Sequence, residues 1–229
     1  MGATNDRYRR LHSREGGSAL ERMVFFSDAV FAIAMTLLVI DIRIPESVEG
    51  DAIGPALVDA IPQIAAYAIS FYVIAANWVA HHRKFTAITA IDSSMIWLNL
   101  VLLFFIAFVP FPTSLLSGHG DTPLIAVIFY DVVMAAVGIV QFLLWVYAWR
   151  HDFVDRRKID DQLYRLINVN LLVTPVVFLL SIPVAAIHPS WGMFFWLVLI
   201  PANILVGRGI YEPRPRPHKV REGDGEHSA

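Results

Sequence analysis

Apolar residues along this chain fall into long runs that are separated by short polar segments. Four windows contain no charged residue and span 18 residues or more: 95–117, 132–149, 166–187 and 189–207. A helix rises about 1.5 Å per residue and needs about 20 apolar residues to cross about 30 Å of hydrocarbon. The pattern therefore predicts membrane-spanning helices instead of the helices of a soluble domain, which alternate apolar and polar faces.

These runs predict six spans, at 23–43, 56–80, 95–117, 124–149, 163–187 and 190–210. Pro62 predicts an interfacial first turn or a kink near the start of the second span, and Pro110 and Pro112 predict a bend or break late in the third. The expected organisation is a basic N-terminal tail at 1–22, a six-helix domain at 23–211 and a disordered C-terminal tail at 212–229. The first tail lacks the apolar core of a signal peptide.

Composition and charge support this interpretation and also predict the orientation of the chain in the membrane. Hydrophobic residues make up 56% of the chain and charged residues 17%, which is typical of a membrane protein. Six spans place 17 of the 18 lysines and arginines on the side of both termini, and only Arg43 on the other. Basic residues collect on the cytoplasmic side of membrane proteins, so we expect a multi-pass cell-membrane protein with both termini cytoplasmic. The chain has no cysteine, so cysteine usage does not indicate whether its compartment is oxidising or reducing.

The motifs of common enzyme classes are missing from the sequence. It contains no glycine-rich phosphate loop, no HExxH zinc motif and no GxSxG nucleophile elbow. His81 and His82 are adjacent, about 100° apart on a helix, which is a poor geometry for a shared metal. We expect no enzyme activity, no bound metal or cofactor and no nucleic-acid partner. The two halves of the chain show no similarity that would indicate a transporter built from repeats.

The first span carries an isolated carboxylate. In the stretch FFSDAVFAIAMTLLVID, residues 25–41, every residue between Asp28 and Asp41 is apolar except Thr36. At about 100° per residue, Ile33, Leu37 and Ile40 fall within about 60° of one another, and Asp28 lies about 140° from Ile33. A carboxylate in an apolar span is costly unless it has a partner, so it marks a candidate functional site.

The sequence allows two interpretations of each face of the first span. The apolar stripe could pack against a neighbouring helix or lipid, or it could have a role of its own. Asp28 could be a structural brace, or it could contact a permeating species. Its possible partners lie at a similar depth in the second and third spans: Asn77, Trp78, His81, His82 and Asn99.

The residues around Asp28 resemble a known family. Arg22, Phe26, Ser27 and Asp28 match the RxxxFSD signature of the prokaryotic branch of the endolysosomal potassium channel family (transmembrane protein 175). The stretches NWVAHHRKF and WLNLVLLFFIAFVPFPTSLL, downstream of the signature, are also similar to that family. The resemblance rests on motifs over roughly residues 20–117 and beyond that on span count and length.

The resemblance implies an all-α homotetramer with six transmembrane helices per chain, in which the four first helices line a central pore. By position, Ile33, Leu37 and Ile40 would form its constriction, and Thr36 would influence selectivity. Arg22, Phe26, Ser27 and Asp28 would brace the pore helix. The fold has no TVGYG filter, and this sequence contains none. Ile40 stands where leucine is common in the family, and Ala32 where a hydroxyl residue is expected.

The expected function is a potassium-preferring cation channel that conducts passively through stacked hydrophobic rings, with K⁺ as the permeating ion. Its partners would be three further copies of the chain and membrane lipid. One alternative is a proton-conducting or proton-coupled carrier that uses Asp28. A second is an adaptor without transport activity, which requires that the apolar stripe serve only in packing.

Overall fold

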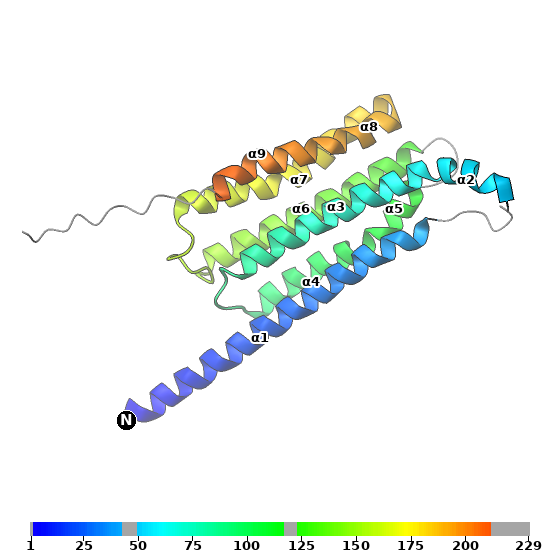
Figure 1. Ribbon diagram of the computed structural model, residues 1–229. Coiled ribbons are helices and arrows are strands. Elements are labelled where there is room, and N and C mark those ends of the chain that lie inside the picture. The colour runs from blue at the N-terminus through cyan, green and yellow to red at the C-terminus, as the bar shows by residue number, and fades with distance from the viewer. Residues whose placement is uncertain (1, 43–49, 117–122, 212–229) are drawn as a thin grey trace, which may run out of the picture.

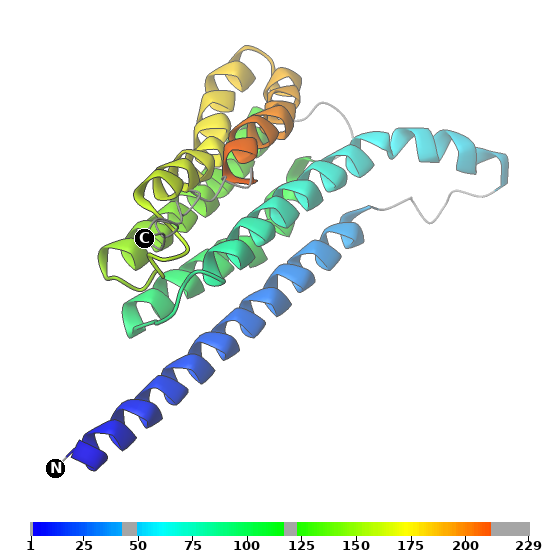
Figure 2. The ribbon, with the colours of Figure 1, turned by 60° about the vertical axis from the view of Figure 1, so that its left-hand side comes forward.

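The chain folds into a bundle of long helices, shown from two sides in Figures 1 and 2. A computed structural model describes residues 2–42, 50–116 and 123–211. The long helices in this part are α1 (Gly2–Leu37), α3 (Ile61–Phe85), α4 (Ser93–Phe108), α6 (Leu124–Arg150) and α7 (Asp161–Ile187). Shorter ones are α2 (Ile53–Asp59), α5 (Pro110–Leu116), α8 (Pro189–Phe195) and α9 (Leu199–Tyr211). The predicted all-helical fold class is confirmed for the described residues.

Five helical segments of the described chain are long and apolar enough to cross a membrane: Ser18–Ile40, Ile61–Phe85, Ser93–Leu116, Leu124–Arg150 and Asp161–Ile187. They correspond to the first five predicted spans. The sixth, predicted at 190–210, consists of α8, a 3₁₀ turn at Trp196–Val198 and α9, with a shorter apolar stretch at Pro189–Leu205. Six spans therefore stay a prediction, and the predicted tail at 212–229 lies outside the described residues.

Helix α1 begins well before the predicted first span, at Gly2 instead of residue 23. Leucine, alanine, glutamate and arginine of the polar segment are good helix formers, and a helix already formed in the span extends at little cost. In both views the N-terminal part of α1 projects beyond the other helices. At its other end α1 tightens into a 3₁₀ turn, η1, at Leu38–Asp41.

Prolines set the starts of two elements. Pro62 lies in the first turn of α3, where its missing N–H costs nothing, and α2 ends one turn earlier at Asp59. The helix is interrupted at Ala60, just before Pro62, where an interfacial first turn or a kink was predicted, and the long helix runs from 61 to 85 where 56–80 was predicted. Pro110 starts α5 after an interruption at Val109, which confirms the predicted break in the third span.

The start of α4 is held by a side-chain cap. Asp92 Oδ1 accepts a hydrogen bond from the Met95 backbone N–H (2.8 Å), and Oδ2 accepts one from Tyr147 Oη on α6 (2.6 Å). Burial acts to raise the pKa of the Asp92 carboxyl, but the hydrogen bonds from Tyr147 and Met95 outweigh it, and the pKa lies below its usual range. The cap thus fixes α4 against α6.

Helix α6 lies against both α4 and α7 and is the most buried of the long helices. Its contact with α7 is close because Gly138 faces Pro175: a Cβ at Gly138 would lie 2.4 Å from Pro175 Cδ. Apolar side chains form one buried cluster around Phe31, Tyr130, Phe178 and Trp196. A second lies around Met95 and Trp145, at the end of the bundle where residues 86–92 and 151–160 connect the helices.

Candidate functional site

The two faces of α1, and of the 3₁₀ turn η1 that continues it, differ sharply in exposure. Phe31, Ala34 and Leu38 are 0%, 1% and 0% exposed and belong to the first buried cluster. On the other face Ile33, Leu37 and Ile40 are 57%, 41% and 56% exposed. The folded chain therefore leaves the three residues of the apolar stripe without cover, whereas it buries the neighbouring Leu38 completely.

Thr36 lies beside this stripe and is exposed. Its Oγ1 donates a hydrogen bond to the Ile33 carbonyl oxygen (2.8 Å). A hydroxyl that donates in this way keeps its oxygen lone pairs available for another partner. Thr36 can therefore present an oxygen ligand on the same side of the helix as the apolar stripe.

A chain of hydrogen bonds ties the opposite face of α1 to α4 and α3. Ser27 is buried, donates to the Met23 carbonyl oxygen (2.8 Å) and accepts from Asn99 Nδ2 (2.9 Å). Asn99 Oδ1 in turn lies 2.9 Å from His81 Nε2. With the amide nitrogen of Asn99 directed at Ser27, its oxygen is the acceptor, so His81 Nε2 carries the proton. Ser27, Asn99 and His81 thus link three helices.

Asp28 makes a separate link to α3. Its Oδ1 accepts a hydrogen bond from Trp78 Nε1 at 2.8 Å, and the Asp28 side chain is half-buried. The Trp78 ring packs beside the ring of His82, with centroids 5.6 Å apart. Of the five possible partners of Asp28, Trp78 is the one within hydrogen-bonding distance in the described structure, while Asn99 pairs with His81 and Ser27 instead.

Three further predicted residues, Asn77, Arg22 and Phe26, have other surroundings. Asn77 donates to the Val73 carbonyl oxygen and accepts from Gln141 Nε2 on α6, so it belongs to a different network from Asp28. Arg22 is exposed, as is Phe26 at 53%. Arg22 forms no ion pair with any residue in the described part of the chain.

The sequence interpretation missed a buried carboxylate in the fourth span. Asp131 on α6 is 0% exposed, and its Oδ1 accepts a hydrogen bond from Trp196 Nε1 (2.8 Å), which also lies 3.2 Å from Ser181 Oγ. These contacts join α6, α7 and the turn after α8. The rule that singled out Asp28, a charge inside an apolar helix, would have found Asp131 as well.

Another interhelical network connects α3 to α5 and α6. Ser70 Oγ lies 3.0 Å from Tyr130 Oη and accepts from Thr113 Oγ1, also at 3.0 Å. All three side chains are buried. Within the described residues no three histidine, aspartate or glutamate side chains are grouped as metal ligands. Ser70, Thr113 and Tyr130 thus connect three helices through hydrogen bonds between hydroxyl groups.

Comparison with known proteins identifies relatives of this chain. The family model described as the endosomal/lysosomal potassium channel TMEM175 matches residues 22–110. A potassium channel of Streptomyces collinus is 32% identical over 167 residues, which cover 72% of this chain and 81% of the relative. A potassium channel of Chamaesiphon minutus is 33% identical over 184 residues, which cover 78% of this chain and 91% of the relative.

A solved structure shares the fold over nearly its whole length. The crystal structure of a lysosomal potassium-selective channel TMEM175 homolog from Chamaesiphon minutus matches with a TM-score of 0.70 and 30% identity, covering 85% of this chain and 99% of that one. The human protein named endosomal/lysosomal proton channel TMEM175 is 28% identical over 155 residues, which are 66% of this chain and 30% of that protein.

Proposed function

The chain belongs to the TMEM175 family of ion channels, and from this premise we propose that it is a potassium-preferring cation channel that conducts passively through a central pore. Bacterial relatives are named potassium channels, and the relatives are not enzymes. The observation that carries the proposal is the exposed apolar stripe of Ile33, Leu37 and Ile40 on a helix whose other face is buried and hydrogen-bonded.

In the proposed assembly four chains bring these stripes to a common axis, where they form three apolar rings. Four residues of α-helix separate Ile33 from Leu37, which is about 6 Å along the axis. The 3₁₀ turn after Leu37 adds about 2 Å per residue and three residues per turn, so Ile40 stands about 6 Å further on and directly in line with Leu37. The tightened turn thus keeps the stripe straight.

Such rings favour potassium through the cost of removing water. A narrow apolar neck is unfavourable for water and ions, and it resists wetting. K⁺ holds its hydration shell less tightly than Na⁺, so it enters the neck at a lower cost. The Thr36 hydroxyl oxygens, beside the neck, supply ligands that replace part of the lost water.

The second candidate function is proton conduction that uses Asp28, because eukaryotic relatives are named proton channels. It requires protons to reach the half-buried Asp28 carboxylate. That carboxylate is engaged by Trp78 on the side of α1 away from the stripe, which favours the brace role.

Recordings from the purified protein in planar bilayers separate these functions. We expect unitary currents far above the turnover of a carrier. With K⁺ on one side of the bilayer and Na⁺ on the other, the reversal potential should follow the K⁺ gradient. A reversal potential that follows the pH gradient instead would establish the proton channel. The absence of unitary currents from folded tetramers would exclude both channel proposals.

We also propose that both termini are cytoplasmic, which the distribution of basic residues supports. The chain has no cysteine, so single cysteines can be labelled without background. In intact cells, cysteines at Ser13 and Ser228 should resist a membrane-impermeant thiol reagent, whereas one at Ala52, in the predicted outer segment, should react. Efficient labelling at Ser13 or Ser228 would contradict the orientation.

A further inference from the structure

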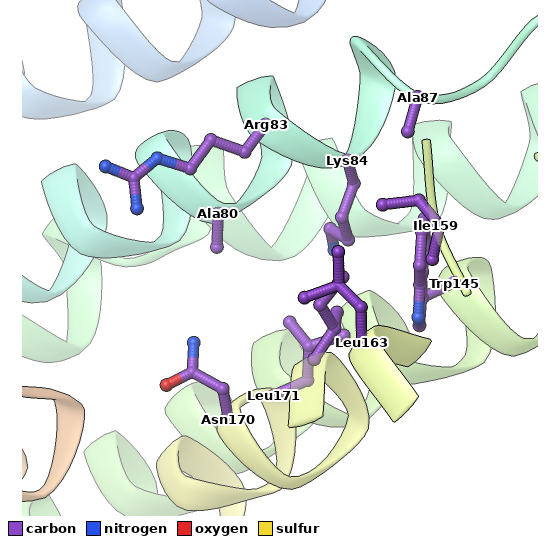
Figure 3. Close-up of a pocket in the computed structure, with 10 residues that line it drawn as sticks. Ala80, Arg83, Lys84, Ala87, Trp145, Ile159, Leu163, Asn170 and Leu171 are labelled. Atoms are coloured by element: carbon purple, nitrogen blue, oxygen red, sulfur yellow. The ribbon is translucent and has the colours of Figure 1, made fainter. Parts of the chain in front are cut away.

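A cavity of about 140 Å³ lies between α3, α6 and α7 and is distinct from the candidate pore face of α1 (Figure 3). It is at the end of the bundle where residues 86–92 and 151–160 connect the helices, the end rich in lysine and arginine. Four residues with polar side chains line it, Arg83, Lys84, Trp145 and Asn170, and aliphatic side chains form the rest of the wall.

Lys84 brings a buried amine to this cavity. Its side chain is 4% exposed, and Nζ donates to the Gln141 carbonyl oxygen (3.3 Å) and to Gln141 Oε1. No carboxylate of the described residues lies within 4 Å of Nζ. A lysine ammonium carries three donors and a full charge, and burying that charge is unfavourable without an opposite one. Within the described part of the chain, Lys84 therefore has no negative partner.

Two further polar groups around the cavity have no hydrogen-bond partner among the described residues. Trp145 is fully buried, yet its indole N–H meets no acceptor in the described structure, and Asn170 Oδ1 meets no donor. In Figure 3 the Lys84 side chain extends from α3 toward α7, with Trp145 on one side of it and Asn170 on the other. Buried indole N–H groups usually find an acceptor. An oxygen-rich anion would accept from both Lys84 and Trp145.

The apolar part of the wall indicates what carries this anion. Leu163, Ile167 and Leu171 follow one another at four-residue spacing on α7, so they line one face of that helix. Leu163 and Ile167 are half-buried, whereas Leu171 is buried in the second apolar cluster. A cationic pocket bordered by half-buried aliphatic side chains at the basic end of the bundle suits a lipid whose head group is anionic. The Asn170 amide can accept from a hydroxyl of the head group.

We propose that this cavity binds the phosphate of an anionic phospholipid, with Lys84 and Trp145 as its donors and the half-buried Leu163 and Ile167 of α7 beside the start of its acyl chains. The same phosphate chemistry could come from a soluble ion, which lacks the acyl chains. The site is independent of the pore, so binding is measured without reference to conduction.

Thermal unfolding of the full-length protein in detergent tests the proposal, with dioctanoyl phosphatidylglycerol, dioctanoyl phosphatidylcholine or inorganic phosphate added. Phosphatidylglycerol should raise the melting temperature saturably and phosphatidylcholine should not. Trp145→Phe keeps the ring and breaks no hydrogen bond in the described structure, so it should fold normally. It should need roughly tenfold more phosphatidylglycerol for the same stabilisation, from the loss of one hydrogen bond to a charged group.

Lys84→Met should lose the response entirely, and two matched variants should keep it. Trp149→Phe alters the next tryptophan along α6, which stacks on Tyr164, and Lys158→Met removes a charge from the adjoining exposed loop. An unchanged response in Trp145→Phe and Lys84→Met, or an equal response to phosphatidylcholine, would overturn the proposal. An equal rise in melting temperature with inorganic phosphate at the same concentration would show that the cavity binds soluble phosphate, and it would contradict the proposal that the ligand is a lipid.

Discussion

Replacing Ile33 or Leu37 with asparagine is expected to raise the unitary conductance several-fold and to bring the K⁺/Na⁺ permeability ratio close to one. Both side chains are exposed on α1 and belong to the proposed apolar rings. Four amides in a ring hydrate the neck and offer oxygen ligands to any monovalent cation, which removes the dehydration barrier that favours K⁺. Conductance and reversal potential under a K⁺/Na⁺ gradient in planar bilayers measure both effects.

Two neighbouring positions serve as controls for this prediction. Val39 is 50% exposed but points about 120° away from Leu37 in the 3₁₀ turn, so Val39→Asn should leave selectivity unchanged. Leu38 is fully buried, so Leu38→Asn should lower the yield of folded protein instead. If Ile33→Asn and Leu37→Asn both form tetramers with unaltered conductance and selectivity, α1 does not line the pore and the proposed mechanism is wrong.

Asn99→Leu is expected to destabilise the folded channel by about 2–5 kcal/mol, because it leaves Ser27 and His81 without their buried partner. The substitution removes the link between α1 and α4 and the link between α3 and α4 together. Thermal unfolding and gel filtration in detergent should show a lower melting temperature and less tetramer. The tetramers that do form should keep the wild-type ion preference, since none of these side chains lies on the exposed stripe.

Asn168→Leu is the matched control for this substitution. Asn168 lies on α7, and its Oδ1 has no partner among the described residues, so the change should shift stability by less than about 1 kcal/mol.

Asp28→Asn keeps an acceptor for the Trp78 indole N–H, so it should lower the stability of the channel less than Asp28→Leu does. A stable Asp28→Asn tetramer with altered ion preference would contradict the brace role and favour permeation past Asp28.

Hydrophobic patterning was a sufficient guide to the long helices because each span must bury its own backbone polar groups in a helix, whatever its neighbours are. The first five spans therefore lie close to their predicted positions. Their ends were less predictable. The extension of α1 to Gly2 and the shift of α3 to 61–85 depend on helix propagation and on where Pro62 permits a start.

The residues of the candidate site show the same difference between what the sequence predicted and what depended on packing. Helical geometry was enough to separate Asp28 from Ile33 and Leu37, since all three lie on the regular part of α1. Ile40 lies in the 3₁₀ turn that follows, which keeps it in line with Leu37. The same spacing could not tell whether that stripe is covered. Its exposure in the folded chain depends on how α3 and α4 pack against α1.

The sequence by itself determined the class of protein, the long apolar helices and the signature that places the chain among its relatives. Only the tertiary structure decided that Trp78 pairs with Asp28, that Asn99 pairs with Ser27, and that Trp196 reaches Asp131. These partners are 50, 72 and 65 residues apart in the chain. A local pattern can place each residue on a face of its own helix, but the distance between two faces depends on the packing of the helices, which no single helix determines.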